Sequence, residues 1–169
     1  MAVQDREITC CFTGHRPSKL PWGYREDDLR CLDLKMDIVQ ALVGLYQRGY
    51  RHFLCGMAEG CDLYFAESLL LLRQVHEDVI LGAAVPFRGQ ADRWSAEQRE
   101  RYHRILDGCD SVFLQQEQYA PGCMMARNRY MVNHSSLLLA CYNGEAGGTR
   151  NTILYAREQG LEILTIPIE

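Results

Sequence analysis

The strongest constraint on the fold of this chain is a regular alternation of apolar, β-type runs with segments of helical periodicity. Six short apolar runs predict strands at 8–13, 52–55, 79–85, 111–114, 137–142 and 161–166. Five segments between them predict helices at 33–48, 62–76, 90–106, 122–133 and 149–159. In the first helical segment, Leu34, Ile38 and Leu42 recur at the spacing of one helix face.

This alternation defines a fold class. Strands that alternate with helices form a parallel sheet with helices on both faces, and a wholly apolar run such as 137–142 suits a strand buried on both sides. We therefore predict one α/β domain over 1–169, a Rossmann-like three-layer domain with a mostly parallel sheet. The strand order does not follow from the sequence.

Composition narrows the environment and the partners. The chain has 169 residues, of which 47% are hydrophobic and 24% charged, and no apolar run is long enough to span a membrane. The first seven residues carry both charge signs and no signal-peptide pattern, so we expect a cytoplasmic protein without a membrane partner. The formal net charge of −4 argues against a general nucleic-acid binder, which needs a basic face.

The 8 cysteines form no C-x-x-C pair, so the sequence predicts no zinc site and no other metal site. We interpret all of them as reduced thiols, and four lie in strand-like runs, where cysteine packs as a small hydrophobic residue. Cys61 stands at a predicted helix start, where a thiolate would be stabilised, but a structural role is the favoured interpretation.

Three glycine-bearing loops fall where predicted strands lead into helices, at 13–17, 56–62 and 144–149. In a parallel sheet all such junctions lie at the carboxyl ends of the strands, where ligands of open α/β sheets bind. The following helix starts offer free N–H groups to phosphate or carboxylate. Neither G-x-x-x-x-G-K-[ST] nor G-x-G-x-x-G occurs, so the loops match neither a P-loop nor the dinucleotide fingerprint.

Several polar residues near these loops have two interpretations each. Arg16 and Arg127 are placed to grip a phosphate through a bidentate fork, or else form surface ion pairs. Asp62 either orients a ribose hydroxyl or caps the helix that it precedes, and one residue can do both. His15 suits acid–base chemistry, although a loop-capping role is favoured.

Two glutamates, Glu59 and Glu145, lie in the glycine loops and are the best spare carboxylates for general-base catalysis. An ordinary solvated loop charge is the favoured interpretation of both. The catalytic residues, if the protein is an enzyme at all, therefore stay open at this point.

Four segments carry a family resemblance: Phe12-Thr-Gly-His-Arg-Pro17, Gly56-Met-Ala-Glu-Gly-Cys-Asp62, Arg127-Asn-Arg-Tyr-Met-Val132 and Gly147-Gly-Thr-Arg-Asn-Thr152. In order and spacing they resemble the YpsA-like family of the SLOG superfamily, which also holds the DprA DNA-processing proteins and the LOG phosphoribohydrolases. The resemblance implies a Rossmann-like fold and a site for a nucleotide or nucleotide-derived ligand, without an established reaction. It covers nearly the whole chain.

Carried over by position, the resemblance assigns the opening motif to Gly14 and Arg16, and the second-strand loop to Gly56, Gly60 and Asp62. It assigns the late phosphate-type loop to Gly147, Gly148 and Thr149. The chain departs from the family at Asn133 and Asn143, where aspartate is usual. It also has Thr152 where the LOG enzymes carry a glutamate that takes part in cleavage, which puts glycosidic hydrolysis by that route in doubt.

Three functions follow as hypotheses: a nucleotide-ligand-binding protein such as a sensor or regulator, an N-glycosidic or phosphoribosyl hydrolase, and a DprA-like binder of single-stranded nucleic acid. The first is preferred, with a nucleotide-type small molecule as the expected ligand, no certain cofactor, and self-association through helices left open. The predicted ligand-binding residues are Gly14, His15, Arg16, Gly56, Met57, Gly60, Asp62, Arg127, Gly147, Gly148 and Thr149.

Overall fold

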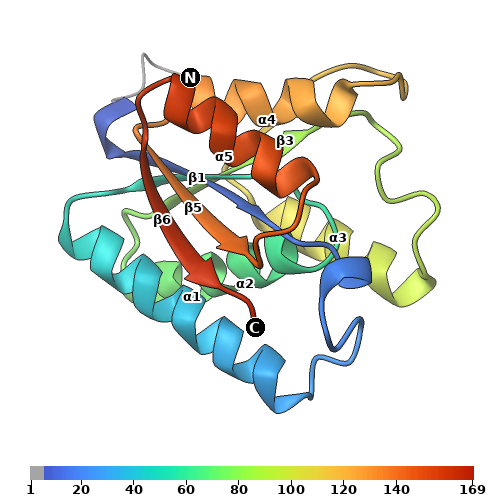
Figure 1. Cartoon of the computed structure of the whole chain (residues 1–169), viewed down its shortest axis with the longest axis horizontal. Helices are drawn as coiled ribbons and strands as arrows, with labels where there is room; N and C mark the ends of the chain where they lie inside the picture. Colours follow the sequence, from blue (N-terminus) through green and yellow to red (C-terminus); the bar gives the residue numbers. More distant parts are fainter. Residues whose placement is uncertain (1–5) are drawn as a thin grey trace.

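A computed structural model describes residues 6–169 as a six-stranded sheet whose neighbouring strands all pair in parallel (Figure 1). The strand order is β4-β3-β2-β1-β5-β6. The strands are β1 Thr9–Gly14, β2 His52–Cys55, β3 Ile80–Val85, β4 Ser111–Leu114, β5 Leu137–Tyr142 and β6 Glu162–Pro167. The predicted Rossmann-like α/β class is therefore confirmed, and the sheet is parallel throughout.

Five helices cover the two faces of this sheet in a three-layer arrangement (Figure 1). One layer holds α1 Leu29–Gln47, α2 Cys61–Val75 and α3 Ala96–Gly108, and the other holds α4 Cys123–Asn133 and α5 Gly148–Glu158. Each layer has its own apolar core against the sheet, with Phe12, Phe53 and Leu139 facing α1–α3, and Leu138 and Ala140 facing α4 and α5. Short 3-10 turns at Arg6–Ile8 and Pro17–Lys19 complete the helical segments.

The chain reverses its direction of travel across the sheet between β4 and β5. From β1 it runs outward through β2 and β3 to β4, and then returns to place β5 on the other side of β1. The loops after β1 and β5 consequently leave the sheet side by side, beside the register pair Gly14 and Cys141. In open α/β sheets this switch point is where a crevice forms at the carboxyl ends of the strands.

Helix starts are where the structure departs most from the sequence-based expectations. Helix α1 begins at Leu29 instead of 33, because the Asp28 side chain caps it by accepting a 2.9 Å hydrogen bond from the Arg30 backbone N–H. Helix α3 begins at Ala96 instead of 90, and Ser95 caps it in the same way. The predicted helix-capping role of Asp62 is wrong, because Gly60 occupies the N-cap of α2 and Asp62 lies within the helix.

The cysteine interpretation is confirmed: all eight are free thiols, and Cys10, Cys11, Cys55 and Cys141 are buried in strands. Cys61 opens α2 as predicted, but the neighbouring Cys141 thiol and burial raise its pKa well above its usual value. This thiol therefore stays protonated at neutral pH. None of the helices in the described part of the chain has the length and apolar character of a membrane span. The expected absence of a signal segment concerns residues 1–5, which lie outside the described residues.

Candidate functional site

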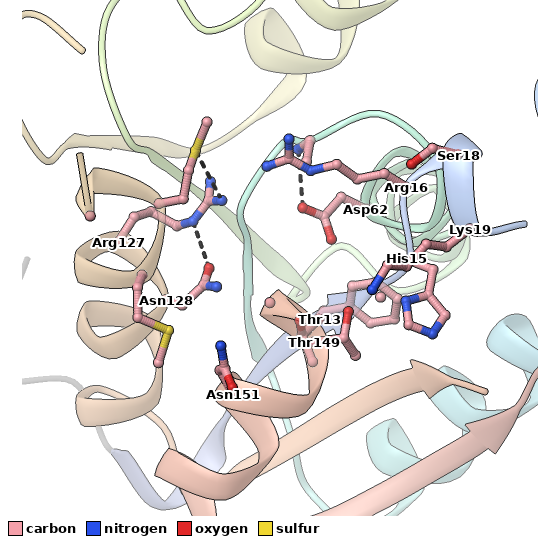
Figure 2. A pocket seen from close by; sticks show the side chains of 17 residues that line it. Thr13, His15, Arg16, Ser18, Lys19, Asp62, Arg127, Asn128, Thr149 and Asn151 are labelled. Atoms are coloured by element: carbon pink, nitrogen blue, oxygen red, sulfur yellow. Dashed lines mark hydrogen bonds between the residues drawn. The ribbon is translucent and has the colours of Figure 1, made fainter. Parts of the chain in front are cut away.

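A cavity of about 340 Å³ opens above the switch point, where the loop after β1 meets the starts of α2, α4 and α5 (Figure 2). It falls within the range of roughly 300–1,000 Å³ that small-molecule sites usually have. The residues that line it are Phe12, Thr13, Gly14, His15, Arg16, Ser18, Lys19, Ala58, Asp62, Gly122, Met124, Met125, Arg127, Asn128, Gly148, Thr149 and Asn151. Of the predicted ligand-binding residues, Gly14, His15, Arg16, Asp62, Arg127, Gly148 and Thr149 are therefore brought together.

Arg127 is the most unusual residue of this cavity, because its side chain is buried without an anionic hydrogen-bond partner among residues 6–169. The residue is only 3% exposed, and its guanidinium donates to the carbonyl oxygens of Gly56 and, at 3.2 Å, Ala84, at the ends of β2 and β3. Its Nε donates to Asn128 at 2.7 Å, while the one partner of Nη2 in the described part of the chain is the Met124 sulfur at 3.9 Å. Burial lowers the pKa of Arg127, and the nearby charge of Asp62 offsets this only in part.

Asp62 faces the cavity from the opposite side, together with Arg16 (Figure 2). Its carboxylate is buried and accepts a 3.0 Å hydrogen bond from the Ala58 backbone N–H. Burial raises the pKa of Asp62, against the lowering influence of Arg127 and Arg16. The Arg16 guanidinium is exposed and makes no hydrogen bond or ion pair with the residues described, so it is free to bind an anion.

Three helices begin at the cavity, and each has glycine at its N-cap: Gly60 for α2, Gly122 for α4 and Gly147 for α5. Glycine has no side chain to accept hydrogen bonds from the first turn, and no other side chain caps these helices. The Cys61 and Cys123 N–H groups already donate to the carbonyl oxygens of His15 and Ala120, at 3.2 and 3.1 Å, so the other first-turn N–H groups and the positive ends of the helix dipoles are what these helices offer at the cavity. With Lys19 and Arg16 also present, the cavity favours anions.

Four predicted residues, Gly56, Met57, Gly60 and Gly147, do not line the cavity but shape its walls. A Cβ on Gly56 would lie 2.8 Å from the Arg127 guanidinium, and one on Gly60 would lie 2.7 Å from the His15 carbonyl oxygen. These glycines let protein segments approach each other, where we expected them to let a ligand approach. Met57 is fully buried and has a φ of 61°, which fixes the turn after β2.

His15 connects the two loops of the switch point. Its Nε2 lies 2.7 Å from the Asn143 side-chain oxygen, and the ring is buried. Burial lowers the pKa of His15, with Lys19 acting in the same direction. This geometry supports the loop-capping interpretation, and it leaves His15 neutral at physiological pH.

Neither candidate general base reaches the cavity. Glu59 accepts a 3.1 Å hydrogen bond from the Tyr24 hydroxyl in a different surface hollow, and Glu145 is exposed. Thr152 is fully buried and donates to the Gly148 carbonyl oxygen at 2.9 Å. Asp62 is thus the only carboxylate among the described residues that line the cavity.

Several lining residues were not predicted from the sequence. Lys19 donates to the Ala146 carbonyl oxygen at 2.5 Å and so joins the loops after β1 and β5. Asn128 accepts from Arg127 and donates to Thr152 at 2.9 Å, which orients the guanidinium from α5. Met124 and Met125 also form part of the wall. The family motifs could have indicated these residues, because Lys19 lies two residues after the motif at 12–17, Asn128 lies in the motif at 127–132 and Asn151 lies in the motif at 147–152.

Within residues 6–169, no three His, Cys, Asp or Glu side chains come together in a group that would hold a metal ion. The fold and the cavity define a parallel α/β protein with an anion-favouring crevice at its switch point. Residues 10–165 match the YpsA family model, described as the YspA SLOG family. The chain belongs to this family, as the sequence motifs predicted.

Two relatives agree with this assignment. The SPbeta prophage-derived protein YoqJ of Bacillus subtilis is 30% identical over 142 residues, which cover 77% of this chain and 82% of the relative. A UPF0398 protein of Halalkalibacterium halodurans is 29% identical over 118 residues, covering 69% of this chain and 62% of the relative.

Two structures of DNA processing protein A (DprA) share the fold at 14% identity. The protein from Streptococcus pneumoniae superposes with a TM-score of 0.61 over 96% of this chain and 51% of the other. The Helicobacter pylori protein, whose title describes a single-stranded DNA binding mode, superposes with a TM-score of 0.65 over 99% of this chain and 68% of the other. This chain thus corresponds to part of each DprA chain.

Proposed function

We propose that the cavity binds a phosphate-bearing, nucleotide-type small molecule, and that the protein acts by binding it, as a sensor or regulator does. The observation that carries this proposal is Arg127, a buried guanidinium that no carboxylate of the described residues contacts through a hydrogen bond. Burying an unneutralised charge costs free energy. An anion at Nη2 would supply the missing partner.

The cavity offers distinct places for the parts of such a ligand. A phosphate between Arg127 and the first turns of α4 and α5 would receive charged and backbone hydrogen bonds together. Arg16 and Lys19 would neutralise further charge at the rim, and Asp62 would accept a hydrogen bond from a sugar hydroxyl. A volume of about 340 Å³ suits one nucleotide unit better than a dinucleotide.

Hydrolysis of an N-glycosidic or phosphoribosyl bond is the second candidate, and among the described residues Asp62 is the only carboxylate at the cavity that could serve it. A general base must reach the reacting water, but Glu59 and Glu145 lie away from the cavity. Asp62 is held by Ala58 and Thr152 is buried in a structural hydrogen bond. Binding without turnover is therefore the preferred function.

Binding of single-stranded nucleic acid is suggested by the H. pylori DprA structure, which is described for its single-stranded DNA binding mode. A strand-binding groove needs an extended basic surface with stacking aromatic side chains. This chain has a formal net charge of −4, and its exposed Arg88 is paired with Glu117, away from the cavity. The test below therefore includes a single-stranded oligonucleotide as an alternative ligand.

The test is thermal unfolding of the full chain against adenosine and guanosine nucleotides, NAD, ADP-ribose, cyclic dinucleotides and a single-stranded oligonucleotide. A ligand at about 100-fold its Kd stabilises the folded state by roughly 2.7 kcal/mol. We expect a mononucleotide to raise Tm, and chromatography of the mixture to recover it intact. Released base would establish the hydrolase, a shift with the oligonucleotide alone would favour nucleic acid, and no shift with any nucleotide would contradict the proposal.

A further inference from the structure

Helix α1 carries two apolar stripes, whereas a helix on the surface of a monomer normally needs one. Its inner stripe packs on the sheet and is buried. Its outer stripe is exposed, with Leu29 at 76% and Met36 at 60% of their full accessible surface. The inner stripe comprises Cys31, Leu34, Ile38, Leu42 and Leu45, and the outer stripe comprises Leu29, Leu32, Met36, Val39 and Val43.

The neighbouring helix α2 extends this exposed apolar surface. Leu71 and Val75 are 62% and 77% exposed, and a shallow hollow between the helices is lined by residues of both, including Leu32, Met36, Val39 and Leu71. A contiguous apolar surface of this kind on a soluble protein marks an interaction site. We call the outer stripe of α1 together with Leu71 and Val75 the outer α1–α2 face.

We infer that the outer α1–α2 face binds a second copy of this chain, with the two α1 helices packed antiparallel across a two-fold axis. The spacing of the stripe is what selects this partner. Leu32, Met36, Val39 and Val43 are four, three and four residues apart, which is the a/d spacing of a helix–helix seam. This spacing is the same when the helix is followed in the opposite direction. An antiparallel copy therefore meets each apolar residue with another.

In that register Met36 faces Val39 of the second copy, and Leu32 faces Val43 of the second copy. The same two-fold axis places α2 beside α2 of the second copy, so that Leu71 and Val75 are covered as well. Both copies of the cavity stay accessible, since it shares no lining residue with the hollow of this face.

The size of the face is sufficient for a specific dimer. Helix α1 has 19 residues and is thus about 28 Å long, and two adjacent helices are about 20 Å wide. Each copy would contribute about 550 Å², so that the pair buries about 1,100 Å², slightly above the roughly 1,000 Å² that a specific interface needs.

Sedimentation velocity of the full chain at rising concentrations tests the interface. We expect a concentration-dependent dimer, and we expect Met36→Lys and Val39→Glu each to raise its Kd at least about tenfold, since each buries a charge in the seam. The matched control is Leu154→Glu, an exposed leucine on α5 in the opposite layer, which should leave the dimer intact. A wild-type monomer throughout, or a dimer unaffected by both α1 variants, would overturn the inference.

The double variant Met36→Lys/Val39→Glu tests the antiparallel register. In that register each introduced lysine faces an introduced glutamate of the other copy, so the dimer should recover relative to both single variants. In a parallel pairing like charges would meet, and the double variant would stay monomeric. A double variant that stays monomeric while its thermal unfolding remains cooperative would therefore overturn the antiparallel arrangement.

Discussion

Two arginines in this protein, Arg101 and Arg127, are both largely buried, but the groups around them differ in charge. Arg101, whose side chain is 12% exposed, is held between Glu26 and Glu67. Although burial opposes it, hydrogen bonds to these carboxylates raise the pKa of Arg101. Arg127 has carbonyl, amide and thioether partners, and burial lowers its pKa. The fold neutralises the Arg101 guanidinium, and we propose that a ligand neutralises the Arg127 guanidinium.

The difference follows from where the two residues lie. Arg101 belongs to α3 and connects three segments, since Glu26 precedes α1 and Glu67 lies on α2, so its ion pairs stabilise the packing of one helical layer. Arg127 lies on α4 at the switch point, where backbone carbonyls of β2 and β3 position it without cancelling its charge. The comparison teaches that burial alone does not define the role of an arginine, and the charge of its partners is the basis on which we propose a binding role for Arg127.

The largest expected effect comes from Arg127→Gln, which removes the charge that we assign to phosphate binding. We expect the affinity for the mononucleotide identified by thermal unfolding to fall at least about 100-fold, or about 2.7 kcal/mol. Arg127→Lys should lose about tenfold, because it keeps the charge without the fork. Isothermal titration calorimetry measures both, and Arg101→Gln serves as the control that binds like the wild type. Equal losses of nucleotide affinity in Arg127→Gln and Arg101→Gln would contradict the proposal that Arg127 binds the ligand and Arg101 does not.

The next effect is on the free energy of unfolding, which we expect Arg101→Gln to lower more than Arg127→Gln. Arg101→Gln leaves Glu26 and Glu67 without their shared cation, so we expect the free energy of unfolding to fall by about 2 kcal/mol. Arg127→Gln should cost less, since it also removes a buried charge without an ion-pair partner. Urea denaturation of the two variants at pH 7 measures this. A larger loss for Arg127→Gln would assign that arginine to the fold.

A smaller effect is expected from Gly56→Ala, which acts on Arg127 through its position. The added Cβ would lie 2.8 Å from the guanidinium, so the side chain must shift and we expect about tenfold weaker ligand binding. Gly44→Ala on α1 is the matched control, because a Cβ there meets no neighbour within 4 Å. Unchanged calorimetric affinity in Gly56→Ala would show that the orientation of Arg127 is not critical.

The smallest effect concerns the two carboxylates near these arginines, whose pH dependences have opposite signs. Burial raises the pKa of Asp62, so its folded form binds protons more tightly than the unfolded chain, and its contribution to stability falls as pH rises above 3.8. Glu26 is the reverse, because despite burial Arg101 and Lys35 lower its pKa, and its contribution is lost as pH falls below 4.5.

Urea denaturation between pH 3.5 and 6 separates the two contributions. Relative to the wild type, Asp62→Asn should gain stability more steeply as pH rises, and Glu26→Gln less steeply. Parallel curves for both variants and the wild type would mean that neither carboxylate has the electrostatic environment described above.

Much of the fold was predictable, because alternation of apolar runs and helical periodicity is a local property of the chain. All six strands lie within one residue of their expected starts and ends. The starts of α1 and α3 were missed by four and six residues, because the caps Asp28 and Ser95 were not recognised. The strand order depends on contacts between distant segments, which a single sequence does not display.

The location of the cavity and its residues Arg16, Asp62 and Arg127 were predictable, but the structural role of its glycines was not. Gly56 and Gly60 have positions that exclude a Cβ, and the sequence cannot distinguish close approach of a ligand from close approach of Arg127 or His15. Lys19 and Asn128 were missed for a related reason. Their side chains reach the cavity only because the loop after β1 and the helix α4 meet in space.

The central claim is that Arg127 at the switch point receives the phosphate of a nucleotide-type ligand. The most direct measurement is a crystal structure of the protein with the nucleotide that gives the largest thermal shift. We predict a phosphate oxygen within hydrogen-bond distance of Arg127 Nη2, close to the first-turn N–H groups of α5. A nucleotide bound outside this cavity, or bound with its phosphate turned away from Arg127, would contradict the account.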